Sequence, residues 1–477
     1  MKRPLPTTTT ANSGNGSTSV VHSSSFRSTT SKLSSSAYVK SRKQVSIPTL
    51  KILVFLVITI GLVILSCTLT SSITRLGSTT TTTTNDKDYN ERPTDFGSCA
   101  INLYGLPRAF QSLVLPSLIR HVIRPNLKYG CDYYIHYYQQ TSEASGRSGT
   151  GGTIDPQQVL LLTKAIQQQV ANQRQQQAES TTTIRMPHIQ YSSTLESDFW
   201  TMYADLIDTI HTTKDPKTGK YKYFPTKAQT YHYPSTVDNI LKMWHSIQSV
   251  FQLMLNATTS VTNTENDNLT TDTKTLLDTS PYRRVAMLRL DVVYVTDLDM
   301  YQARSDLPDP SNDYVVIPGF GRHPISDRLI VGPIQAVSIW AQERFSRLEE
   351  HVQYTQAYDP GFTMHSERFV NATLLGAIRK ELMQGPKPIV KDIVEHDTLC
   401  FFRARADESV WIRDCHATDP AVAMPSIYQQ LGGSIPAIRQ RVETTLGRKC
   451  HDIRIFKKPY TQALDCSIHG KTTTDKH

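Results

Sequence analysis

A strongly apolar segment that runs directly into acidic residues constrains the fold more than any other feature of this sequence. Residues 284–299 read RVAMLRLDVVYVTDLD: one apolar run ends at Asp291, and a second leads to Asp297 and Asp299. In α/β proteins, ligands bind beyond the carboxyl ends of such buried strands. Carboxylates at that position bind Mg²⁺ or Mn²⁺ together with substrate phosphates. The stretch predicts a phosphate-bearing substrate, with turn-forming aspartates as the alternative.

Strand and helix patterns alternate through the rest of the C-terminal part. We expect strands at 99–104, 132–138, 285–295, 314–317 and 398–403, and helices at 107–122 (kinked or broken at Pro116), 159–170, 198–210, 237–255, 333–348 and 370–382. This order predicts an α/β fold: a mostly parallel sheet flanked by helices, with right-handed crossovers.

An uncharged apolar run at 52–69 is close to the length that spans a bilayer. The tail before it has seven basic residues and no acidic one, which predicts a cytosolic N-terminus and a single-pass type II membrane protein. A cleaved signal peptide is the alternative, but its apolar core would lie nearer the N-terminus.

The run divides the chain into four parts. We expect a disordered tail at 1–50, a signal anchor at 51–69, a Thr-rich stem at 70–97 and a lumenal domain at 98–477. Polar insertions at 141–183 and 256–280 are expected at the surface of that domain rather than in its core.

The excess of positive charge in this chain comes almost entirely from the N-terminal tail. Of the chain's net charge of +9, the tail and Lys51 carry eight charges, which leaves 43 basic against 42 acidic residues elsewhere. A nucleic-acid partner needs a basic face on the folded part, so none is expected.

Six cysteines follow the stem, and none of them forms a Cys-x-x-Cys pair. An even number in an oxidising lumen allows up to three disulfides among fifteen possible pairings, whereas zinc binding is not expected. Glycosylation sequons at Asn256, Asn268 and Asn371 agree with lumenal exposure.

Five short motifs occur in a fixed order: GLPRAF at 105–110, YGCDYYIHYY at 129–138, YRRVAMLRLDVVYV at 282–295, DRLIVGPIQAVSIW at 327–340 and MHSERF at 364–369. This order resembles that of nucleotide-sugar glycosyltransferases with the GT-A fold, which are type II membrane proteins of the Golgi apparatus. The resemblance implies a Rossmann-type sheet, a nucleotide-sugar donor, a glycan or glycoprotein acceptor, and Mn²⁺ or Mg²⁺.

The same resemblance assigns roles on the donor side. Enzymes of this fold carry Asp-x-Asp at a strand end to hold the metal against the diphosphate, but here the matching residues are Arg289, Leu290 and Asp291. Arg289 is therefore expected to contact a phosphate itself, as is Arg108 in the first loop. Asp291 is the preferred metal ligand, with Asp297 and Asp299 as further candidates.

On the acceptor side, the resemblance points to Asp327 as a general base, with Arg328 beside it facing the donor or acceptor. Glu367 is expected to act as a second base or to contact the acceptor. For both acids a helix-terminal structural role is the alternative. Asp132 is interpreted as marking a nucleotide-binding edge.

Two other function classes stay open. The Arg289 departure favours a catalytically inactive lumenal protein that binds glycans or nucleotide sugars. A sulfotransferase is less favoured, because GLPRAF lacks the Lys and Ser of a sulfotransferase phosphate loop. Neither a Walker-type phosphate loop nor a Gly-x-Ser-x-Gly elbow is present.

Overall fold

The structure, a computed structural model, describes residues 98–145, 151–176, 184–225, 232–262, 273–302, 313–358, 360–416, 419–454 and 462–468. The predicted tail, anchor and stem lie outside these residues, as does the sequon at Asn268. No helix within the described ranges is both long enough and apolar enough to cross a membrane. The membrane anchor at 51–69 therefore stays a prediction.

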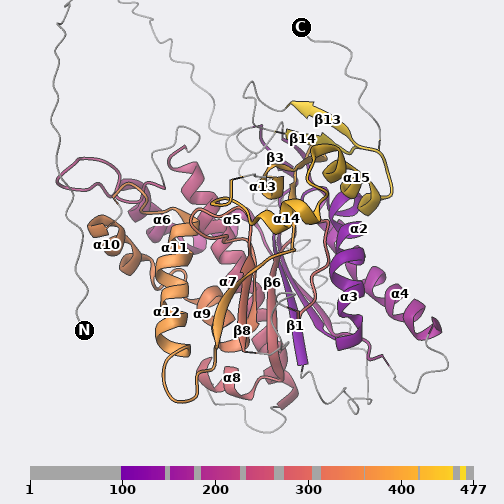
Figure 1. Cartoon of the computed structure of the whole chain (residues 1–477). Helices are drawn as coiled ribbons and strands as arrows, with labels where there is room; N and C mark the ends of the chain where they lie inside the picture. Colours follow the sequence, from indigo (N-terminus) through magenta and orange to yellow (C-terminus); the bar gives the residue numbers. More distant parts are fainter. Residues whose placement is uncertain are drawn as a thin grey trace, which may run out of the picture. The chain divides into compact units, whose positions relative to one another are not determined.

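A seven-stranded sheet forms the centre of the fold (Figure 1). Its order is β10 (Asp392–His396), β8 (Tyr314–Pro318), β9 (Ile330–Pro333), β6 (Tyr282–Arg289), β1 (Ser98–Gly105), β2 (Asp132–Tyr138) and β5 (Ile189–Thr194). Only β9 runs antiparallel to its neighbours β6 and β8; the pairs on either side are parallel. The predicted α/β class with a mostly parallel sheet is confirmed.

Helices cover both faces of this sheet (Figure 1). One face packs against a continuous helical segment made of η1 (Phe110–Val114), α2 (Leu115–Leu118), η2 (Ile119–Ile123), α3 (Arg124–Asn126) and η3 (Leu127–Tyr129), and against η4 (Pro156–Leu160) and α4 (Leu161–Gln176). The other face packs against α5 (Glu196–Met202), α6 (Ala204–Thr212), α7 (Ser235–Thr262), α9 (Ile334–Gln342), α10 (Leu348–Tyr358) and the continuous α11 (Ser366–Phe369), η5 (Val370–Leu374) and α12 (Leu375–Leu382).

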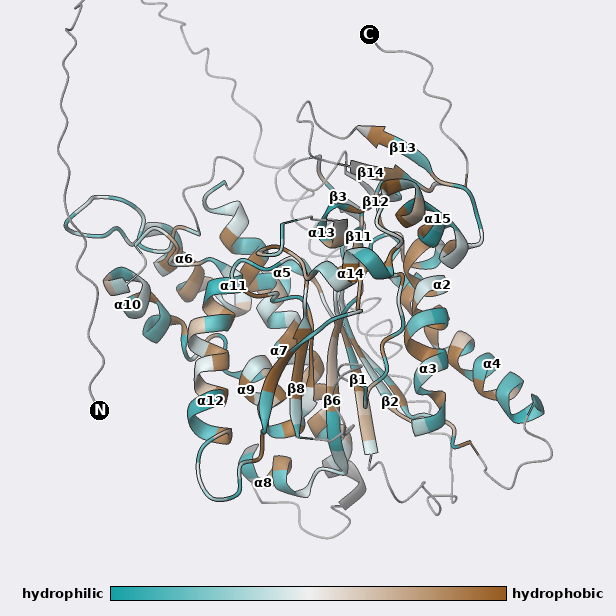
Figure 2. Ribbon diagram, viewed as in Figure 1, coloured by the Kyte–Doolittle hydropathy of each residue, from teal (hydrophilic) through white to brown (hydrophobic). Residues whose placement is uncertain are grey.

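Side chains of β1 alternate between the two apolar layers, as the pleat of a strand requires. Ile101 and Leu103 belong to the layer under α2 and α4, whereas Ala100 and Tyr104 belong to the layer under α7 and α9. Figure 2 shows the covering helices with both brown and teal residues, the composition of amphipathic helices that have one buried face.

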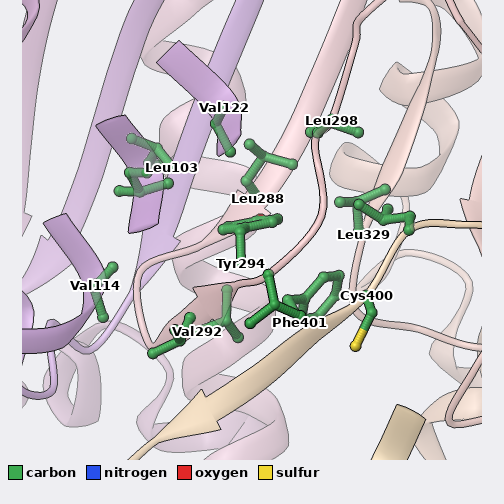
Figure 3. Close-up of a cluster of buried hydrophobic side chains, with 14 of the residues drawn as sticks. Leu103, Val114, Val122, Leu288, Val292, Tyr294, Leu298, Leu329, Cys400 and Phe401 are labelled. Carbon is green, nitrogen blue, oxygen red and sulfur yellow. The ribbon is translucent and has the colours of Figure 1, made fainter. Parts of the chain in front are cut away.

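The segment 284–299 does not form one strand. β6 ends at Arg289, the chain turns at Asp291, and β7 (Val292–Tyr294) joins a second sheet of order β13 (His451–Arg454), β14 (Gln462–Asp465), β12 (Ser409–Trp411), β11 (Phe401–Ala404) and β7. The expectation of a single strand over 285–295 is therefore wrong. Leu288, Val292, Tyr294 and Phe401 share one apolar cluster beneath this turn (Figure 3).

The helix expected at 107–122 continues through Pro116 to Tyr129 instead of breaking there. The N–H groups of Leu115 and Arg124, each directly before a proline, bond to Phe110 and Ile119, five residues back. These wider π turns leave room for the proline ring and need no hydrogen bond from it.

The polar segment 141–183 contributes to the core. It contains the short hairpin of β3 (Ser142–Glu143) and β4 (Gly152–Thr153), and Val159, Leu162 and Ile166 of its helical part are fully buried.

The expected helix over 198–210 is divided at Tyr203 into α5 and α6. The remaining helices are α8 (Thr273–Thr279), α13 (Arg413–His416), α14 (Pro425–Gln430) and α15 (Ile435–Leu446).

Three disulfides pair all six cysteines of the C-terminal part. Cys99–Cys131 joins the starts of β1 and β2, Cys400–Cys415 joins β11 to α13, and Cys450–Cys466 joins β13 to the end of β14. The expected disulfide framework is confirmed.

Candidate functional site

The strand order reverses direction between β1 and β6, and this is where α/β sheets bind ligands. The chain leaves β1 for β2 on one side, while β6 lies on the other side of β1 and is followed in the sheet by β9. Gly105 ends β1 with φ +114°, a backbone conformation that favours glycine. Its N–H donates to Ser246 Oγ at 2.9 Å, which fixes the start of the loop that carries Arg108.

Asp291 lies just past the end of β6 and is held between two arginines. Arg289 donates to both of its oxygens, at 2.7 and 2.8 Å, and Arg108 donates to Oδ2 at 2.7 Å. The residue is only 3% exposed. Burial raises the pKa of the Asp291 carboxyl, but the charges of Arg289 and Arg108 outweigh it and hold the pKa well below its usual range.

Arg108 also binds Glu143, which was not predicted. Its Nε and Nη2 donate to the two carboxylate oxygens of Glu143 at 2.8 and 2.6 Å. Glu143 lies in β3 and pairs with Gly152 of β4. A Cβ at Gly152 would lie 2.8 Å from the Ala406 carbonyl, so this glycine lets the hairpin pack closely against the loop after β11. Arg108 thus joins Asp291 to the hairpin.

A pair of acids occupies the loop before β9 and the start of α11. Ser366 donates its hydroxyl hydrogen bond to the Asp327 carboxylate, and Glu367 follows in the first turn of α11. Burial, and then the charge of Asp327, raise the pKa of Glu367 to about 8. Glu367 therefore retains its proton to a higher pH than an ordinary glutamate does. His365 Nδ1 lies 3.2 Å from Glu367 Oε2.

Arg328 connects this pair to a third acid, Asp414 of α13. Arg328 Nη1 donates to Asp414 Oδ2 at 2.8 Å, and Arg403 Nε lies 3.3 Å from the same oxygen. Burial raises the pKa of Asp414, but the charges of Arg328 and Arg403 outweigh this effect and hold the pKa well below its usual range. A Cβ at Gly321 (φ +64°) would lie 2.9 Å from the Arg328 guanidinium, so this glycine makes room for Arg328 and does not form a phosphate loop.

The donor-side and acceptor-side residues belong to one electrostatic cluster. The pKa of Arg289 is lowered by burial but raised by Asp291 and also by Asp327. Burial lowers the pKa of Arg328, the charges of Asp414, Asp327 and Glu367 raise it above its ordinary value, and the charge of Arg289 opposes part of that rise. The structure therefore brings together five residues that were predicted to act in concert: Arg108, Arg289, Asp291, Asp327 and Arg328, with Glu367 beside Asp327.

Asp297 and Asp299 have other partners. Asp297 Oδ1 lies 2.6 Å from His121 Nδ1, and Asp299 Oδ2 accepts from Lys128 at 2.9 Å and Tyr129 at 3.1 Å. These contacts attach the segment after β7 to the helical segment 110–129. Within the described ranges, no group of three or more His, Cys, Asp or Glu side chains is arranged to hold a metal ion.

Asp132 lies at the first residue of β2, at the opposite end of the strands from Asp291. It binds Arg185, the Tyr282 hydroxyl at 2.8 Å and the His188 N–H at 2.7 Å. These contacts join β2, β6 and the chain before β5, and they place Asp132 away from the cluster around Asp291; its interpretation as a nucleotide-binding edge stays a prediction.

Two arginines of the cluster, Arg403 and Arg405, were also missed. They alternate along FFRAR, a spacing that places both on one face of an extended strand. That alternation could have been read from the sequence. Asp414 could not, because it reaches the cluster through its contact with Arg328, which is 86 residues away in the sequence.

No family model matches the sequence, and a search of the curated proteins finds no relative.

Proposed function

We propose that this chain is a glycosyltransferase that transfers a sugar from a nucleotide-sugar donor to a hydroxyl group of a glycan or glycoprotein. The observation that carries the proposal is the cluster of arginines and paired acids at the ends of β1 and β6. Arg108, Arg289 and Arg328 supply positive charge there, and Asp327 with Glu367 supplies an acid–base pair. The observed α/β sheet agrees with the GT-A fold that the sequence motifs suggest.

Asp327 is proposed as the general base. Its carboxylate takes the proton of the acceptor hydroxyl as the hydroxyl oxygen forms a bond to the anomeric carbon. The bond from that carbon to the phosphate oxygen breaks, and its electron pair leaves with the nucleoside diphosphate. The Ser366 hydroxyl holds the Asp327 carboxylate in place. Glu367, protonated at neutral pH, donates a hydrogen bond to the acceptor.

The arginines are proposed to stabilise the leaving diphosphate. Arg289 and Arg328 present planar guanidinium groups, which match phosphate oxygens in pairs. Negative charge that develops on the leaving group lies beside fixed positive charge, and such an arrangement lowers the transition-state energy.

The residues do not fit the metal that the resemblance implies. Both oxygens of Asp291 are occupied by guanidinium N–H groups, and its neighbours Arg108 and Arg289 would repel a divalent cation. No further metal-ligating side chain beside Asp291 is arranged with it in the described residues. No step of the proposed reaction is therefore assigned to a metal.

The proposed location is the Golgi membrane, with the folded part in the lumen. The three disulfides support an oxidising compartment, and the apolar run at 52–69 supports an anchor. Protease protection in sealed microsomes tests this topology: digestion of the C-terminal domain from outside the vesicles would contradict it.

Thermal-shift titration of the full-length protein distinguishes the function classes. A rise in Tm with uridine or guanosine diphosphate is expected for a glycosyltransferase. A rise with adenosine 3′,5′-bisphosphate alone would favour the sulfotransferase. Nucleotide binding without turnover would favour the inactive binding protein, for which the Arg289 departure is the supporting observation.

A further inference from the structure

Among the residues that the structure describes, the cluster holds more guanidinium than carboxyl groups. Its guanidinium groups are six: Arg108, Arg289, Arg328, Arg344, Arg403 and Arg405. Its carboxyl groups are five: Glu143, Asp291, Asp327, Glu367 and Asp414. Six guanidinium groups therefore face five carboxyl groups, and burial and the charge of Asp327 raise the pKa of one of these, Glu367, to about 8. A diphosphate ester, with one negative charge on each phosphoryl group, would balance this excess.

Arg405 is the arginine of the cluster that most clearly lacks a counter-charge. It is 4% exposed, its guanidinium lies 4.2 Å from the centre of the Trp411 ring, and its buried Nε has no hydrogen-bond partner. Like charges on Arg403 and Arg108 act on it, and Asp291 and Glu143 only partly offset them. A buried cation without a bonded counter-charge is costly, so this position favours an anion.

Arg344 is a second buried arginine that stacks on a tryptophan and has unpartnered guanidinium nitrogens. It is fully buried, it stacks 4.0 Å from the Trp340 ring, and none of its three nitrogens has a hydrogen-bond partner. Burial lowers the pKa of Arg344 to about 10, and the charge of Asp327 offsets only part of this effect. The cluster therefore contains two buried arginines that have unpartnered guanidinium nitrogens.

An anion from solvent can reach the cluster. The side chains of Arg108, Arg289 and Arg403 keep 16%, 21% and 27% of their surface exposed, whereas Asp291 between them keeps 4%. Each of these three arginines therefore exposes more of its side chain to solvent than Asp291 does. A divalent cation would meet the arginines first, and both Asp291 oxygens are already bonded.

We propose that the donor diphosphate binds this arginine cluster directly, with Arg405 as a phosphate-binding residue and without a divalent cation. The inference rests on the proposed function for the identity of the anion. Arg405 holds one phosphoryl group by charge-assisted hydrogen bonds, and the Trp411 ring fixes the plane of its guanidinium. The arginines take the place that a metal ion would have against the diphosphate.

Calorimetric titration of the full-length protein tests the proposal, with uridine diphosphate, guanosine diphosphate and inorganic pyrophosphate as probes. Each titration is done in excess EDTA and in Mn²⁺. We expect one nucleotide to bind in EDTA with an affinity within about twofold of that in Mn²⁺, since no metal contributes. Binding only in Mn²⁺ would overturn the proposal and leave the proposed function intact.

The Arg405→Met variant should weaken binding about 10- to 100-fold, the usual loss for a hydrogen bond to a charged group. Arg405→Lys keeps the positive charge, so it should lose less binding affinity than Arg405→Met does. Arg379→Met removes an exposed arginine of α12 and should bind as the wild type does. If a folded Arg405→Met protein binds the nucleotide with wild-type affinity, Arg405 is not a phosphate-binding residue.

If Arg405→Met does not fold, the comparison of EDTA with Mn²⁺ in the wild-type protein decides the metal question. Pyrophosphate binding in EDTA without binding of either nucleotide would support the anion site and contradict the proposed function. Absence of binding by all three probes in both conditions would overturn both proposals.

Discussion

Replacing Asp291 by asparagine removes the negative charge that lies between Arg289 and Arg108. The shape of the side chain is kept, but the three contacts at 2.7 to 2.8 Å lose their anion, and the oxygen replaced by NH₂ can no longer accept a hydrogen bond. Breaking a buried pair costs about 3–5 kcal/mol, because the partner charge stays buried without compensation. Both arginines keep some solvent exposure, so we expect a cost near the lower end, about 3 kcal/mol.

The pH of the experiment follows from the direction of the pKa shift. The pKa of Asp291 is lower in the folded state than in the unfolded state. Its stabilisation is therefore present in full above the unfolded pKa, about 3.9, and is lost only as the pH falls through the folded pKa. A measurement at neutral pH captures the whole effect.

Thermal unfolding followed by circular dichroism measures this cost. The unfolding entropy of a domain of this size is about 0.8 kcal/mol/K, so a loss of about 3 kcal/mol lowers Tm by about 4 °C. The matched control is Asp297→Asn, because the Asp297 side chain is 67% exposed and pairs with one histidine. A surface pair of this kind contributes at most about 1 kcal/mol to the free energy of unfolding, so its loss should lower Tm by about 1 °C.

Equal Tm values for Asp291→Asn and Asp297→Asn would refute the reasoning, because Asp291 could then not be the counter-charge of two buried arginines. Pyrophosphate gives a second measurement on the same proteins. It should raise the Tm of Asp291→Asn more than that of the wild type, because the variant leaves two guanidinium groups without their carboxylate.

Three further predictions follow from the site and the disulfides. Asp327→Asn should lower kcat for sugar transfer about 10²- to 10⁴-fold with nucleotide affinity unchanged; steady-state kinetics and calorimetry check this, and an unchanged kcat would exclude Asp327 as the base. Glu367→Gln should gain stability over the wild type as the pH rises. The raised folded pKa of about 8 means that the native wild type binds more protons than the unfolded chain between about pH 4.5 and 8, so its stability falls by up to about 1.4 kcal/mol per pH unit there. Urea unfolding at several pH values measures the difference, and a pH-independent one would contradict the raised pKa. Replacing Cys400 and Cys415 by alanine should cost about 3 kcal/mol, since the disulfide closes a loop of 15 residues; a loss under about 1 kcal/mol in urea would count against that disulfide.

Local sequence patterns predicted much of the fold. β1, β2 and β8 appear where short apolar or aromatic runs indicated strands, and α7 appears where apolar residues recur at helical spacing. These elements are specified by their own side chains. β9 was missed, because its four residues Ile330–Pro333 are continuous with the apolar pattern of α9 and their pairing depends on β6 and β8.

The site was predictable where its residues adjoin a strand or a helix start. Asp291 at the end of β6 and Asp327 before β9 have such positions. Glu143 and Asp414 do not: each reaches the cluster through a side-chain contact between distant parts of the sequence, with Arg108 in one case and with Arg328 in the other. No local spacing encodes such contacts.

The second apolar run also shows the limit of local patterns. The sequence predicted acids near one another at 291, 297 and 299, but β7 carries the chain into a different sheet between them. Asp297 and Asp299 therefore bind the helical segment 110–129. The pairing of β7 with Phe401 and its neighbours separates Asp291 from Asp297 and Asp299 in space. The sequence of this segment alone does not reveal that pairing.

A donor screen tests the central claim most directly. The full-length protein is incubated with a panel of nucleotide sugars and glycoprotein acceptors in excess EDTA, and again in Mn²⁺, and the release of nucleoside diphosphate is measured with Asp327→Asn in parallel. The account predicts release from one class of donor, undiminished in EDTA and lost in the variant. Absence of release from every donor in both conditions, or equal release by the variant, would contradict it.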